Sequence, residues 1–159
     1  MQAAERDALK ERHRFREWAG KSSLPADRSV QGLSMTGEEL PGFRLDRLDR
    51  RADTQPPRLT SFWRRTGTQA VVRVDIFECV SVTDAHEYLI DALNEFESAA
   101  ILRRTDVAIG DVAFGSDSVV LFARSNLVVL VRKATPQTEA VVSIAQTIDA
   151  LILGRLKAG

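Results

Sequence analysis

Hydrophobic residues form two dense runs, at 119–123 and 127–131, separated by Arg124-Ser125-Asn126. Both runs are rich in β-branched residues and too short for helices, so they predict the central hairpin of a sheet. Ser125 and Asn126 would form its two-residue turn, because Asn tolerates the positive φ angle that such turns require. We expect the rest of the chain to be organised around this hairpin.

A second hairpin is predicted before it, where two β-prone segments, 59–65 and 70–80, flank the turn signal Thr66-Gly67-Thr68. Gly110 and Gly115 then bound a further short strand, and residues 101–104 could begin another. Several antiparallel neighbours joined by short turns indicate a mainly antiparallel sheet.

Two amphipathic helices are also predicted. After a cap at Ser81 or Thr83, apolar residues recur at three- and four-residue steps, namely at Ala85, Tyr88, Leu89, Ala92, Leu93, Phe96, Ala99 and Ala100. Thr135-Pro136 would begin the second helix, which continues to the C-terminus. The element order ββαβββα predicts an α+β two-layer sandwich with both helices on one face of the sheet.

Residues 1–58 follow a different pattern and are predicted to lie outside the α+β domain, which would span residues 59–159. Residues 1–19 alternate charges around a thin apolar stripe and predict a helix that ends at Gly20. Such a narrow stripe means that this helix docks on the domain, docks on a partner or frays. Prolines and glycines punctuate the following irregular arm, in which residues 42–48 could form a short edge strand.

Composition narrows the possible functions. The 22 basic and 22 acidic residues cancel, so no overall charge favours nucleic acid, and we expect no nucleic-acid partner. No apolar run approaches the length of a transmembrane helix, and the N-terminus lacks the apolar core of a signal peptide. The single cysteine fits either the cytosol or, if an export signal was removed, the periplasm or cell envelope.

Candidate catalytic groups are few. His13 and His86 have no second His or Cys at metal-ligand spacing, so no metal site is expected. Gly110 to Ser116 has the glycine spacing of a phosphate-binding loop but lacks its lysine, so no cofactor is expected. Cys79 is predicted to be a small buried hydrophobe. His86, beside acidic neighbours on the helix that begins near Ser81, is predicted to be solvated.

The pattern Gly110-Asp111-x-Ala113-Phe114, followed by Phe122-x-Arg124-x-Asn126, resembles one found in uncharacterised bacterial extracytoplasmic domains that are often borne by lipoproteins. The resemblance covers residues 59–155 at most, and Ser125 stands where that pattern commonly has Gly. It implies a small α+β fold and an envelope location, and it transfers no catalytic residue.

These observations favour a non-enzymatic interaction or accessory module of a bacterial complex, whose partner is another protein or a second copy. Five apolar residues of the N-terminal segment lack obvious internal partners and are the predicted partner-binding residues: Phe15, Trp18, Leu40, Phe43 and Leu45. An alternative is a small-molecule or lipid carrier with an apolar pocket between the sheet and the C-terminal helix. An enzyme would have to use Asp111, Arg124 or the pair of Cys79 and His86.

Overall fold

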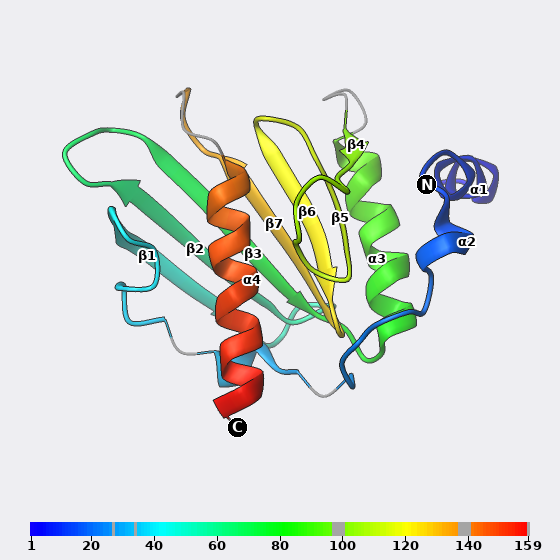
Figure 1. The fold of residues 1–159 in the computed structure, drawn as a ribbon, viewed down its shortest axis with the longest axis horizontal. Helices are drawn as coiled ribbons and strands as arrows, with labels where there is room; N and C mark the ends of the chain where they lie inside the picture. The colour runs from blue at the N-terminus through cyan, green and yellow to red at the C-terminus, as the bar shows by residue number, and fades with distance from the viewer. Residues whose placement is uncertain (27, 34, 97–100, 137–140, 159) are drawn as a thin grey trace.

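In the part of the chain that the structure describes, seven antiparallel strands form one sheet in the order β1-β2-β3-β7-β6-β5-β4 (Figure 1). This computed structural model describes residues 1–26, 28–31, 33, 35–96, 101–136 and 141–154, together with the backbone of residues 32 and 155–158. The strands are β1 (Phe43–Arg51), β2 (Arg58–Arg65), β3 (Val71–Glu78), β4 (Leu102–Arg103), β5 (Val112–Gly115), β6 (Val119–Arg124) and β7 (Leu127–Lys133). The predicted α+β class and the antiparallel sheet are confirmed.

The helices are α1 (Ala3–Arg12), α2 (Phe15–Trp18), α3 (Val82–Glu95) and α4 (Val141–Ala158), with a short 3-10 helix, η1 (Val30–Gly32). The predicted cap of α3 is confirmed, because the Ser81 side chain accepts a hydrogen bond from the backbone N–H of Asp84. The predicted last turn of this helix falls on residues 97–100, outside the described residues. The predicted start of the last helix at Thr135-Pro136 was wrong, because both residues lie in a bend and the Thr135 hydroxyl accepts a hydrogen bond from the Val71 N–H, at 2.9 Å. No helix among those described is long and apolar enough to cross a membrane.

β6 and β7 are buried on both faces. Val120 and Phe122 belong to an apolar cluster that includes α4, whereas Leu121 and Leu130 belong to a second cluster that includes α3. Because successive side chains of a strand point to opposite faces, α3 and α4 cover opposite faces of the sheet. The expectation that both helices share one face was therefore wrong here. Strands with near-continuous apolar runs are those that need cover on both sides.

The central hairpin has the predicted register but not the predicted turn residue at positive φ. Arg124 pairs with Leu127, which leaves Ser125 and Asn126 as the two-residue turn. The positive φ, 57°, is at Ser125 rather than at Asn126. The carboxamide of Asn126 instead holds the N-terminal arm, as described below.

The N-terminal segment completes the sheet and both apolar clusters. β1 pairs with β2 along its length, and the Arg50 guanidinium donates to the carbonyl oxygens of Val30, at 2.6 Å, and Leu33. Val30 and Leu33 pack with α4 in one cluster, whereas Leu9 of α1 packs with α3 in the other. The predicted boundary after residue 58 thus falls inside one continuous sheet.

Candidate functional site

The five residues predicted to bind a partner, Phe15, Trp18, Leu40, Phe43 and Leu45, all pack within this chain. Trp18 and Leu40 are each only 3% exposed to solvent. Phe15 is partly buried against the α3 cluster, and Phe43 and Leu45 against the α4 cluster. Trp18 and Leu40 are therefore unavailable to a partner. The apolar side chains of the N-terminal segment are evident from the sequence. That they pack in the two apolar clusters of this chain is evident only from the structure.

Helix α1 docks on the acidic side of α3. Arg6 donates to Glu87 at 2.6 Å and forms an ion pair with Asp91, and Lys10 lies 2.8 Å from Glu87. These side chains keep between 26% and 48% of their surface exposed, so each pair contributes modestly to stability. Glu87 and Asp91 of α3 thus have basic partners in the same chain.

Arg124, at the end of β6, is clamped by two carboxylates. Its Nε and Nη2 donate to the two Asp149 oxygens at 2.8 and 2.7 Å, and its Nη1 lies 3.4 Å from Asp111 Oδ1. The Gly110 N–H also donates to Asp149, at 2.8 Å. Gly110 has a φ of 62°, and a Cβ there would lie 2.5 Å from the Ala123 carbonyl oxygen, so glycine is required. This network ties α4 to the hairpin and supports a structural role for Asp111 and Arg124.

Residues of the Gly110-to-Asn126 pattern also anchor the arm. Asp111 Oδ2 accepts hydrogen bonds from the Ser22 hydroxyl at 2.6 Å and from the Ser125 N–H at 2.7 Å. The Asn126 carboxamide accepts from the Arg28 N–H at 2.9 Å and donates to the Arg28 carbonyl at 2.8 Å. Asp111 and Asn126 therefore specify an attachment point for the arm.

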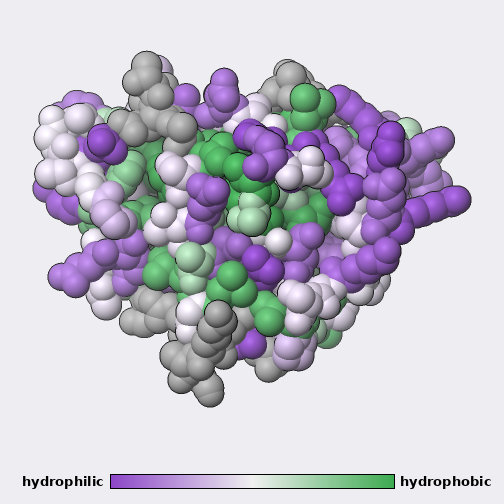
Figure 2. Space-filling view, viewed as in Figure 1, coloured by the Kyte–Doolittle hydropathy of each residue, from purple (hydrophilic) through white to green (hydrophobic). Residues whose placement is uncertain are grey.

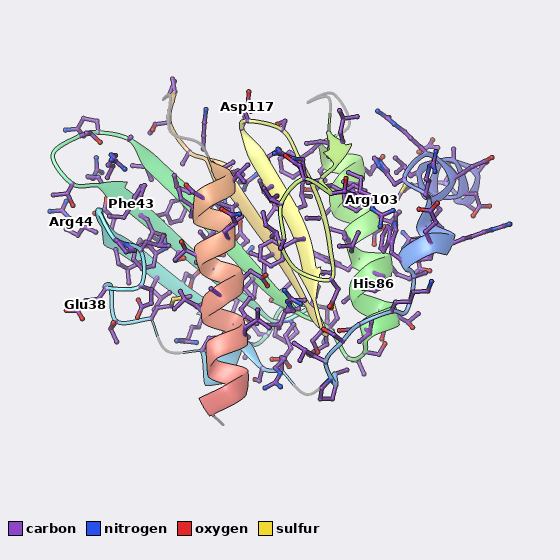
Figure 3. The ribbon with its side chains drawn as sticks, viewed as in Figure 1. Glu38, Phe43, Arg44, His86, Arg103 and Asp117 are labelled. Carbon is purple, nitrogen blue, oxygen red and sulfur yellow. The ribbon has the colours of Figure 1, made fainter. Side chains whose placement is uncertain are left out.

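Cys79 and His86 are both buried. Burial raises the pKa of Cys79 to about 12, which disfavours the thiolate. His86 lies on α3 (Figure 3) and is fully buried, its Nδ1 accepting a hydrogen bond from the Gly20 N–H at 2.9 Å and its ring contacting Trp18 at 5.3 Å. The prediction of a solvated His86 was wrong, because α2 covers a second side of α3. The sequence contained one indication of this burial: Ile90, one helical turn after His86 and on the same side of α3, is apolar, and it is also fully buried.

The buried imidazole predicts a loss of stability below about pH 6.5. Burial lowers the pKa of His86 from its ordinary value of 6.5, and the Asp111 carboxylate opposes this only in part. The unfolded chain therefore binds more protons than the folded one between the folded-state pKa and 6.5, so the free energy of unfolding decreases as the pH falls through this range. Urea denaturation between pH 7.5 and 5.5 measures this decrease. It should be smaller in His86→Gln, and an equal decrease in both proteins would contradict the assignment.

The interface between α4 and the sheet is packed with side chains rather than hollow. The apolar residues of α4 that face the sheet are at most 5% exposed: Val141, Ile144, Ala145, Ile148 and Ile152. This packing gives no support to a carrier pocket at that place. Hydrophobic side chains show toward the centre of this side of the molecule, whereas hydrophilic ones cover the α1 end (Figure 2).

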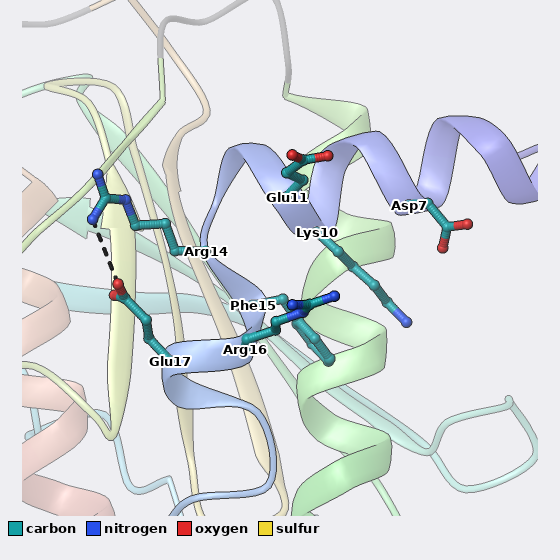
Figure 4. Close-up of a pocket in the computed structure, with 7 residues that line it drawn as sticks. All are labelled: Asp7, Lys10, Glu11, Arg14, Phe15, Arg16 and Glu17. Atoms are coloured by element: carbon teal, nitrogen blue, oxygen red, sulfur yellow. Dashed lines mark hydrogen bonds and ion pairs between the residues drawn. The ribbon is translucent and has the colours of Figure 1, made fainter.

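A hollow of about 800 Å³ opens instead at the surface of α1 and α2 (Figure 4). Its lining is mostly charged, with Phe15 as the aromatic member and an ion pair between Arg14 and Glu17 at its side. Among the described residues, no group of three or more His, Cys, Asp or Glu side chains is arranged to hold a metal ion. This hollow does not bring together the groups considered for catalysis, Asp111, Arg124, Cys79 and His86.

The side of β1–β3 that points away from α4 is rich in arginine. Leu59 and Trp63 of β2 face α4, so Phe62 and Arg64 point to the opposite side. The strand registers and side-chain contacts place the following ionisable residues on that side: Arg44, Asp46, Arg47, Asp49, Arg51, Arg58, Arg64, Arg73, Asp75 and Arg132. Among the described residues, this surface, the arginine face, therefore has seven arginines against three aspartates.

All three of these aspartates neutralise part of the charge, and so does Asp53, just past the end of β1. Asp49 lies 4.0 Å from Arg58, and Asp53 lies 3.1 Å from Arg51. Asp46 accepts hydrogen bonds from Arg64 at 2.8 Å and from Arg44 at 3.3 Å. Asp75, with a side chain 2% exposed, accepts from Arg73 at 2.8 Å and lies 4.0 Å from Arg132. The carboxylates thus hold several guanidinium groups in place but leave a positive surplus.

Phe62 lies between two guanidinium groups at the middle of the arginine face. Arg47 of β1 and Arg73 of β3 pair with it from either side, 5.9 and 5.5 Å from the ring centre. Arg47 is exposed, and no carboxylate of the described residues lies within 4 Å of its guanidinium. It is therefore a cation that can accept an anionic group without displacing one.

One end of the arginine face is concave. A hollow of about 360 Å³ is lined there by Arg44 and Arg64 of the face, by residues 66–69 of the β2–β3 turn, and by Arg65, which points to the α4 side over the Phe43 ring. Arg44 is seen beside this turn in Figure 3. The lining contains three arginines, which suits an anionic group.

Comparisons with protein-family models, with curated proteins and with solved structures found no significant match to this chain.

Proposed function

We propose that this chain is a non-enzymatic interaction module that docks a partner protein through the arginine face. The observation that carries the proposal is the asymmetry of the sheet at β1–β3. One side is buried under the arm and α4, whereas the other presents exposed or half-buried arginines around Phe62. Arginine and aromatic side chains are the types enriched at protein interfaces. The titratable groups considered for catalysis, Asp111, Arg124, Cys79 and His86, are engaged inside the fold.

The charge of this face favours a different protein over a second copy. A two-fold symmetric dimer brings the same patch of both copies together, so two arginine faces would repel each other. We therefore propose an accessory role in a complex with another protein. The resemblance to bacterial envelope domains adds an extracytoplasmic location to this proposal, which fractionation of the source cells tests.

Site-specific photo-crosslinking tests the docking face. A photoreactive amino acid replaces Gln69, which lines the hollow, or Gln146, which is exposed on α4, in cells of the source organism. We expect a discrete cross-linked species from position 69 that is absent from position 146. It should disappear when Arg44→Glu and Arg47→Glu are added. The same species from both positions, or its persistence in the charge-reversed protein, would contradict the proposal.

A further inference from the structure

Resting on the proposed function, we infer that the partner presents a carboxylate-rich polypeptide segment. This segment lies across β1–β3 on the arginine face, with carboxylates at Arg47 and in the hollow beside the β2–β3 turn. Three neighbouring features of β1–β3 support the inference. Arg47 is exposed, and the Phe62 ring lies between two guanidinium groups. The hollow at the end of the face is lined by Arg44, Arg64 and Arg65.

The cations of this face are all arginines. A guanidinium is planar and donates two parallel hydrogen bonds to a carboxylate, which gives orientation as well as attraction. Asp75 shows this type of contact within the face, since Arg73 Nε and Nη2 donate to its two oxygens at 2.8 and 3.2 Å, whereas Asp46 accepts one hydrogen bond each from Arg64 and Arg44. Arg47 has the same chemistry but no carboxylate partner in the described part of the chain, so a carboxylate from another chain completes the pattern.

The same surface is less suited to nucleic acid or an anionic membrane. Single-stranded nucleic acids bind where aromatic faces are free for base stacking, but Arg47 and Arg73 already flank the Phe62 ring. Asp46, Asp49 and Asp75 also interrupt the positive surface, so a continuous row of phosphates would meet like charges. A polypeptide avoids this repulsion because it can place its acidic side chains between the aspartates.

Fluorescence anisotropy with defined probes tests this inference on the full chain. The probes are a labelled peptide of alternating glutamate and serine, the same peptide with glutamine for glutamate, a single-stranded oligothymidylate, and phosphatidylserine vesicles followed by sedimentation. We expect binding of the glutamate peptide and none of the glutamine peptide. The Kd should rise roughly tenfold or more in the double variant Arg44→Glu, Arg47→Glu.

The matched control is the double variant Arg16→Glu, Lys21→Glu, which changes the net charge by the same amount at exposed positions outside the face. Its Kd should stay within about twofold of the unmodified protein, because screening limits the reach of a distant charge to roughly 10 Å. In Arg47→Lys, which keeps the charge but loses the planar fork, we expect an intermediate Kd. Thermal melting verifies that each variant is folded, and Arg47→Gln replaces the double variant if the latter melts early.

Three results would overturn the inference: equal weakening in the control variant, tighter binding of oligothymidylate or vesicles than of the glutamate peptide, or no binding of that peptide. Cross-linking at position 69 separates these failures from a failure of the proposed function. A face-dependent cross-link without binding of the peptide leaves the docking face in place and rejects the acidic partner. Loss of both rejects the docking face as well.

Discussion

Removal of residues 1–41 is expected to abolish the cooperative unfolding transition of the remaining chain. The deleted segment contributes five side chains that are at most 6% exposed: Leu9, Trp18, Val30, Leu33 and Leu40. Burying a large apolar side chain stabilises by about 1.5–3 kcal/mol, so together they supply on the order of 10 kcal/mol. This is comparable with the ~5–15 kcal/mol that holds a typical domain together.

Thermal and urea denaturation followed by circular dichroism measure this effect on residues 42–159. A chain that lacks only Met1 and Gln2, which precede α1, serves as the control and should unfold like the full chain. Addition of a synthetic peptide of residues 1–41 should restore part of the transition, because it supplies the missing apolar side chains of both clusters. A cooperative transition at an unchanged midpoint in residues 42–159 would show that the arm is dispensable for folding.

Asp149→Ala is expected to destabilise the fold by about 3–5 kcal/mol, the range for removing one partner of a buried ion pair. The Arg124 side chain is 12% exposed and would keep only the 3.4 Å contact with Asp111 as an ion pair. The Gly110 N–H would lose its acceptor at the same time. An uncompensated guanidinium in this setting costs more than the pair itself contributes.

Urea denaturation at pH 7 measures this loss, and Asp149→Asn is the matched control. The carboxamide keeps one acceptor oxygen of similar shape, so its destabilisation should be smaller. In Arg124→Met, Asp149→Leu, which removes both charges, the loss should be less than the sum of the two single changes. A stability change below about 1 kcal/mol in Asp149→Ala would show that water or Asp111 compensates Arg124.

The local elements of this protein could be predicted from the sequence alone. The apolar runs around residues 124–126 gave the central hairpin, and three- and four-residue spacing gave α3 with its cap at Ser81. Cys79 was predicted to be buried, as it is. These features depend on period and on residues close together in the chain, so composition and spacing were sufficient.

Only the tertiary structure decided which surfaces are covered. His86 is buried because α2 packs on α3, and the carboxamide of Asn126 is committed to the arm at Arg28. The arginine face could not be predicted, because it combines strands from residue 44 to residue 132 whose neighbours in space are set by sheet order. Periodicity tells which side chains of a strand share a face, but not whether a helix, an arm or a partner will cover that face.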